Sequence, residues 1–351
     1  MFEVTIKVSG RSLTSFVFYN DLLPQLHLSI TKDCIINFDF TDLERISPLI
    51  LPSLTNVGIV IKNFTSTPPL LIFGYKPKLF SYLNAIGWVD IVNSLNAFSF
   101  GPDFGGYNAS SKLSEACIIW PLDNEFKYYI GDIGVRNYQG ESPIEKLEST
   151  VGDHLSPVLI EVMAELIENV HEHANLTDGL YGFASFFANK KREFLFSISD
   201  IGQGFYNSLL SKYEQGEWTP RIFSIQEFTS QDQQRNFRAI IEAIFLRKIQ
   251  KGDDRPAVNG LCTIMDDVLS IPGGTMRIHC ENTQAIFTSS NYSEFLHKEI
   301  DDLLIKKIRD RIIQGKEWAL EDQFSPLRVT TAKLQGVHIE IEFPLTEKRS
   351  Y

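Results

Sequence analysis

The residues of this chain that are best suited to chemistry begin with a short segment, ELIENVHEHA, at 165–174. Helical periodicity puts Glu165 and Asn169 one turn apart, so both side chains point into the same space. The amide oxygen of Asn169 is a hard ligand of the kind that Mg²⁺ prefers, and Glu165 can orient or deprotonate a water molecule beside a phosphate group. The alternative is a solvated acidic helix face, although Asn169 and His173 are poor choices for solubility alone.

A second segment with chemical potential, DIGQG at 200–204, directly follows an alternating strand over 193–199. Gly202 and Gly204 permit positive φ angles and a close approach of the backbone to a ligand. A buried Asp200 at the strand end can accept a hydrogen bond from an exocyclic amine such as adenine N6. The alternative is a plain tight turn, because the pattern also occurs in turns without ligands.

A third candidate site lies where Asn259, Gly260 and Leu261 precede a helix predicted over 262–269. Free amide groups and the helix dipole at such a helix start favour a phosphate. Arg255, shortly upstream, can reach a phosphate or remain solvated. A helix that uses a glycine only for entry is the alternative for this segment.

These residues need a scaffold of helices and strands in the second half of the chain. Ser156 and Pro157 indicate a helix start, and apolar residues then recur at helical spacing up to Val170. The sequence predicts two strands between 272 and 287 and an alternating closing strand over 335–345. The intervening residues, 289–333, form a predicted insertion with an amphipathic helix over 300–313.

The first hundred residues predict a small module of alternating strands and helices. Strands are expected at 2–8, 15–19, 34–40 and 70–74, with one helix from near Asp42 towards Val60 and another over 77–87. Residues 101–150 are rich in Gly, Asn, Ser, Pro and Asp, and their composition predicts a connector with one or two strands.

In type and order, ELIENVHEHA and DIGQG resemble the N box and first glycine box of the GHKL ATPase superfamily, which includes histidine kinases, gyrase B, MutL and heat-shock chaperones. The resemblance implies a Bergerat-fold two-layer α/β sandwich with a mixed sheet over 151–347, so the chain is expected to be α/β (α+β). It implies that Asn169 holds Mg²⁺ and that Glu165 assists an attacking water. The residues implied to bind the nucleotide are Asn169, His173, Asp200, Gly202, Gly204, Asn259, Gly260 and Leu261.

Two positions depart from the family pattern. The second glycine box usually carries two or more glycines, whereas this chain has Gly260 alone, which bears on how tightly a triphosphate is held. Many relatives have a Thr where this chain has Val337, so one polar contact to adenine is expected to be missing or to run through water. At the other end of the chain, residues 1–100 loosely resemble a STAS module, without a serine placed as a phosphoacceptor.

Composition narrows the function classes. A net charge of -11 argues against nucleic-acid binding through overall charge, since phosphates require a basic face. The scattered Cys34, Cys117, Cys262 and Cys280 indicate reduced thiols rather than a zinc site or a disulfide framework. No signal peptide or window of about 18 apolar residues is present. A cytoplasmic protein without membrane or nucleic-acid partners is expected.

The leading hypothesis is an ATP- and Mg²⁺-binding GHKL protein, a slow ATPase that acts as a nucleotide-dependent switch on a partner protein or as a homodimer. A protein serine kinase of the anti-sigma-factor type is one alternative. A non-hydrolysing regulator, such as a stress, toxin–antitoxin or phage-defence component, is another. A histidine kinase is disfavoured, because no long helical pair precedes Ser156.

Overall fold

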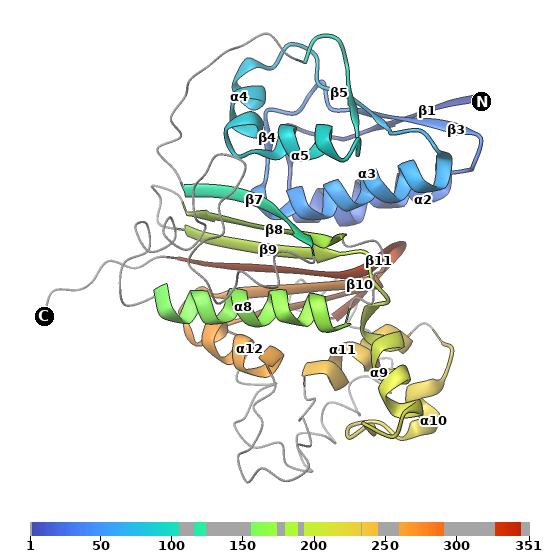
Figure 1. Ribbon diagram of the computed structural model, residues 1–351, viewed down its shortest axis with the longest axis vertical. Coiled ribbons are helices and arrows are strands. Elements are labelled where there is room, and N and C mark those ends of the chain that lie inside the picture. The colour runs from blue at the N-terminus through green and yellow to red at the C-terminus, as the bar shows by residue number, and fades with distance from the viewer. Residues whose placement is uncertain are drawn as a thin grey trace, which may run out of the picture.

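The computed structural model is an α+β protein with one parallel and one antiparallel main sheet (Figure 1). It describes residues 2–104, 116–123, 156–173, 180–188, 193–232, 234–244, 260–290 and 327–344. Within these ranges, no helix is both long and apolar enough to cross a bilayer.

The N-terminal module is built on a parallel four-stranded sheet in the order β1-β3-β5-β6. Its strands are β1 (Phe2–Lys7), β3 (Cys34–Asp39), β5 (Leu70–Ile72) and β6 (Ser99–Phe100). A small second sheet pairs β2 (Ser12–Leu13) with β4 (Arg45–Ile46). The helical segments are α1 (Ser15–Val17), the π-helical η1 (Phe18–Leu22), α2 (Leu23–Ser29), the 3₁₀ turn η2 (Pro48–Ile50), α3 (Leu51–Thr65), α4 (Pro77–Ala85) and α5 (Trp88–Ser94).

The strand predicted at 15–19 is wrong, because these residues begin a helical run that continues through α2. The side chain of Thr14 caps this run by accepting a hydrogen bond from the Val17 N–H. The buried residues of the run, Phe18, Tyr19, Leu22, Leu23 and Leu26, follow the helical period rather than the alternation of a strand. The predicted helix after Asp42 begins later than expected, at Leu51.

The second sheet has five strands in the order β10-β11-β9-β8-β7. They are β7 (Ala116–Asp123), β8 (Leu180–Ala188), β9 (Glu193–Asp200), β10 (Thr275–Thr288) and β11 (Leu327–Pro344). Every neighbouring pair is antiparallel, so the mixed sheet expected here is wrong for the described strands. Residues 189–192 alone separate β8 from β9, and so short a connection forces an antiparallel pair.

A strand was expected within the connector at 101–150, and β7 confirms it, forming the edge of the sheet beside β8. Two other strands differ from their predicted limits. β11 begins inside the predicted insertion at 289–333. The two strands expected between 272 and 287 are one strand, β10, with a register irregularity at Glu281, whose φ is 55°. The helix predicted over 300–313 lies outside the described residues.

One face of the antiparallel sheet carries the helices of the C-terminal half. They are α8 (Ser156–His173), α9 (Gly204–Glu214), α11 (Arg235–Ile244) and α12 (Gly260–Ser270), with the short α10 (Ile225–Thr229) beside α11. Leu159, Val162, Met163, Leu166 and Val170 of α8 are buried in the core formed with this face, as their spacing predicts.

The opposite face of the same sheet is covered by the N-terminal module. α3 contacts β8 and β9, while η1 and α2 contact β11. Figure 1 shows the resulting order of layers: the parallel sheet, then α2 and α3, then the antiparallel sheet, and then α8 and α12. The antiparallel sheet is therefore enclosed on both faces.

Polar side chains connect the module to the sheet. Asn56 Nδ2 donates to Ser199 Oγ at 2.7 Å, and Ser199 Oγ lies 2.5 Å from His338 Nδ1. Burial lowers the pKa of His338 to about 3, so the ring is neutral at physiological pH. The Gln335 carbonyl can only accept, so Nε2–H of the neutral ring donates to it at 3.1 Å, and Nδ1 accepts from the Ser199 hydroxyl. This chain of hydrogen bonds specifies one tautomer.

Two further contacts of this interface involve buried groups of β10 and β11. The Tyr19 ring stacks on the His279 ring with centroids 4.4 Å apart, and burial holds the pKa of His279 well below its ordinary value. Ser15 Oγ donates to Glu340 Oε2 at 2.6 Å. The module thus sits on side chains of the sheet that are polar yet removed from water.

Candidate functional site

A cavity opens between the helices and the antiparallel sheet. It encloses about 740 Å³ of empty space, a volume that includes the part open to solvent. Its lining is mostly apolar and comes from α8, β9, α9, α11, α12 and β11. The lining residues are Leu166, Asn169, Val170, Ile198, Asp200, Gly204, Phe205, Ser208, Leu209, Lys212, Ala243, Leu261, Val337 and Ile339.

Asp200 is the buried charged group of this cavity. It ends β9, it is 4% exposed, and its Oδ1 accepts a hydrogen bond from the Gly202 N–H at 2.7 Å. Burial raises the pKa of Asp200 to about 7, opposed by hydrogen bonds from the backbone N–H groups of Gly202 and Val337. Near neutral pH the carboxyl group can therefore accept a hydrogen bond from a ligand or, when protonated, donate one.

Strand β11 approaches Asp200 so closely that only glycine fits at position 336. A Cβ built on Gly336 would lie 2.1 Å from the Asp200 carbonyl oxygen and 2.8 Å from Oδ1, and the φ of Gly336 is +93°. This approach brings the Val337 N–H to the carboxyl group. Val337 itself lines the cavity, and its side chain offers no polar group there.

The helix α8 forms the wall that carries Asn169. Its side chain lines the cavity between Leu166 and Val170. Glu165 lies one turn before Asn169 and is half-buried, and it does not belong to the lining. His173 is the last residue of α8, and its side chain lies outside the described residues.

The other predicted site residues divide into three groups. Gly204 and Leu261 line the same cavity as Asn169 and Asp200. The Gly202 N–H donates to the Asp200 carboxyl group, and Gly260 is the first residue of α12. Asn259 lies outside the described residues, as does Arg255.

Sequence reasoning missed the contribution of α9 beyond its first residue. Ser208 and Lys212 line the cavity, and neither was among the predicted site residues. Gly204, Ser208 and Lys212 follow one another at intervals of four residues, and this spacing indicates that they share one side of a helix.

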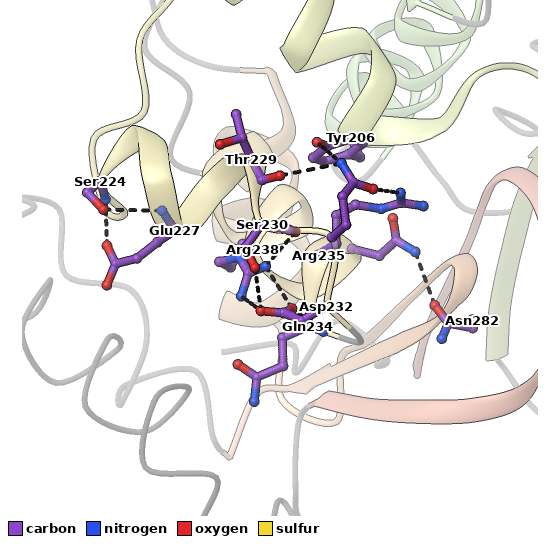
Figure 2. Close-up of polar contacts among 12 residues, drawn as sticks. Tyr206, Ser224, Glu227, Thr229, Ser230, Asp232, Gln234, Arg235, Arg238 and Asn282 are labelled. Carbon is purple, nitrogen blue, oxygen red and sulfur yellow. Dashed lines mark hydrogen bonds and ion pairs between the residues drawn. The ribbon is translucent and has the colours of Figure 1, made fainter.

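A polar cluster fixes the segment between α9 and α11 (Figure 2). Arg238, which is 5% exposed, pairs with Asp232 at 2.8 Å and donates to the Ser230 carbonyl at 3.1 Å. The Arg235 guanidinium lies 4.7 Å from the centre of the Tyr206 ring, so α11 is also joined to α9. These contacts hold in place the two helices that supply Lys212 and Ala243 to the cavity.

A buried carboxylate gives further support to this region. Glu242 of α11, 1% exposed, accepts hydrogen bonds from the backbone N–H groups of Arg221, Ile222 and Phe223 at 2.8 to 3.1 Å. Burial raises the pKa of Glu242, and these backbone donors oppose the rise. The loop before α10 is thereby anchored to α11.

Comparisons of the chain with protein-family models, with curated proteins and with solved structures gave no match.

Proposed function

We propose that this chain binds ATP with Mg²⁺ in the cavity between α8, α9 and α12, in the manner of a GHKL protein with a Bergerat-type fold. The observation that carries the proposal is that Asn169 and Asp200 line one cavity, although they come from separate motifs. The apolar lining supports it as well, because a nucleobase needs flat apolar walls beside a polar group that recognises its edge.

Asp200 would recognise the adenine. Its buried carboxyl group, held by the Gly202 and Val337 N–H groups, can accept a hydrogen bond from the exocyclic amine of adenine. Guanine presents a carbonyl oxygen at the corresponding position, and two acceptors repel each other. Ile198 and Ile339, which flank this point in the lining, supply apolar contact to a ring.

Asn169 would hold the magnesium ion. Among the described residues, no group of three or more His, Cys, Asp or Glu side chains could hold a metal ion. Mg²⁺ bound through one amide oxygen, phosphate oxygens and water fits this composition, because Mg²⁺ keeps several waters and uses few protein ligands. α12 begins at Gly260, beside the lining residue Leu261, and the amide groups and dipole of a helix start favour a phosphate.

Hydrolysis would depend on Glu165, as the general base or the group that orients water. Glu165 is half-buried and one turn from Asn169 on α8. We expect Glu165→Gln to slow ATP hydrolysis while leaving ATP affinity unchanged. A wild-type chain that binds ATP without hydrolysing it would instead be a nucleotide-dependent regulator of a protein partner or of its own dimer.

Calorimetry on the full chain tests the binding proposal. Wild type should bind ATP in preference to GTP, and Asp200→Asn should weaken ATP binding about tenfold or more, the cost of a hydrogen bond to a charged group. Asn169→Ala should bind ATP equally with Mg²⁺ and with a chelator. The control is Glu168→Ala, an exposed change on the same helix outside the cavity. Absence of ATP binding to wild type, or unchanged affinity in Asp200→Asn, would overturn the proposal.

A further inference from the structure

The wall formed by α9 carries a row of three residues, and neither motif accounts for the second and third of them. Gly204, Ser208 and Lys212 follow one another at intervals of four residues, and all three line the cavity. At 1.5 Å per residue, Lys212 lies about 12 Å along the helix axis from Gly204, the last residue of the DIGQG segment that begins with Asp200. The row therefore extends away from the buried carboxyl group towards the other end of α9.

The charges of the cavity are separated along this row. Asp200 and Lys212 are the charged members of the lining within the described part of the chain, and Lys212, unlike Asp200, is only half-buried. The lining thus offers an acceptor at one end and a cation at the other. A ligand with an amine at one end and an anion at the other is complementary to this arrangement.

Acidic residues near the cavity make the positive charge of Lys212 more important for binding an anion. α8 supplies Asn169 to the lining and carries Glu165 and Glu172 about one turn to either side of it, and the whole chain has a net charge of -11. A polyphosphate that approaches this side of the molecule meets like charge. A lysine in the lining offsets that repulsion locally, since opposite charges at short range in a partly desolvated site attract strongly.

We infer that Lys212 binds the phosphate chain of the nucleotide and makes the site selective for nucleoside di- and triphosphates over nucleosides. Ser208, midway along the row, is placed to contact the sugar. The inference rests on the proposed ATP binding and adds a specificity-determining residue at a position outside both motifs. It assigns recognition of the base to Asp200 and recognition of the phosphates to Lys212.

The test is a ligand series on the full chain: adenosine, AMP, ADP and ATP, each measured by calorimetry with wild type and with Lys212→Gln. We expect Lys212→Gln to weaken ADP and ATP binding about tenfold or more, as for a lost charged hydrogen bond, and to leave adenosine affinity nearly unchanged. The loss should persist when Mg²⁺ is chelated, which separates it from the effect of Asn169→Ala. Lys212→Arg, which keeps the charge, should retain most of the affinity for ATP.

The matched control is Lys333→Gln, the same substitution at an exposed lysine outside the cavity. It should bind all four ligands as wild type does. If Lys212→Gln weakens adenosine and ATP binding equally, or weakens neither, the assignment of Lys212 is wrong while nucleotide binding stands. If wild type binds none of the four ligands, the proposed function fails together with the inference.

Discussion

Glu340 allows a sharp test of how the two halves of the molecule pack. It lies on the face of β11 that the N-terminal module covers, and it is 2% exposed. Its Oε2 accepts the Ser15 hydroxyl and lies 3.8 Å from Arg277 Nη1, while Oε1 has no hydrogen-bond partner among the described residues. Burial raises the pKa of Glu340 to about 7, which the Arg277 charge and the Ser15 hydrogen bond only partly oppose. We predict that Glu340→Gln stabilises the protein at alkaline pH.

The size of the effect follows from proton linkage. Between the ordinary glutamate pKa of 4.5 and about 7, the folded protein keeps a proton at Glu340 that the unfolded chain has released. The free energy of unfolding therefore falls as the pH rises through this window. At about 1.4 kcal/mol for each pH unit, the loss is about 3 kcal/mol and is complete above the folded-state pKa. Glu340→Gln removes this loss, so its advantage should be close to zero at the acidic limit and about 3 kcal/mol at the alkaline limit.

Equilibrium urea unfolding of wild type and Glu340→Gln, at about pH 5 and about pH 8, measures the difference. Asp200 also has a raised pKa, but it is present in both proteins and cancels. Glu342→Gln is the control on the same strand: its side chain is 39% exposed and pairs with Arg277 at 3.2 Å, and such a pair contributes less than about 1 kcal/mol. Should Glu340→Gln unfold more easily than wild type at pH 8, the carboxylate would have to be charged and satisfied in the folded state, and the reasoning would be refuted.

Three further substitutions test packing. Gly336→Ala would put a Cβ 2.1 Å from the Asp200 carbonyl oxygen, so we expect lower stability and loss of ATP binding by calorimetry; unchanged affinity would contradict the close approach. Glu242→Ala leaves the N–H groups of 221–223 without their carboxylate acceptor. At about 1–3 kcal/mol for each buried donor, we expect urea unfolding to show a free energy of unfolding lower by about 3 kcal/mol or more. A smaller decrease would argue that water replaces the carboxylate. Gly58→Ala puts a Cβ 2.4 Å from a phenylalanine ring carbon, so its Tm should fall, consistent with an overpacking cost of about 1–3 kcal/mol; an unchanged Tm would mean that the ring can move aside.

Local signals predicted the elements that frame the candidate site. The Ser156–Pro157 start and the apolar spacing up to Val170 predicted α8, and the alternation before Asp200 predicted β9. The motifs also led to the expectation that Asn169 and Asp200 converge, and both line one cavity. Short-range periodicity suffices here because each element is long enough to show one period clearly.

Long-range pairing and short ambiguous runs were not predictable in the same way. A run such as 15–19 is too short to distinguish two periods, and its helical state depends on burial against the module core. The pairing of β7 with β8 joins segments separated by a long stretch of chain, and no local pattern specifies it. The spacing of Lys212 from Gly204 indicates only a shared helix side, and how α9 packs decides that this side faces the cavity.

The alternation of side chains along β11 has a mechanical consequence. Val337 and Ile339 line the cavity, whereas His338 and Glu340 make the hydrogen bonds on the side of the N-terminal module. Successive residues of a strand cannot move independently, so a ligand that displaces this strand from one side also displaces the atoms on which the module rests. A ligand in the cavity is therefore coupled through β11 to the N-terminal module, although it does not contact that module.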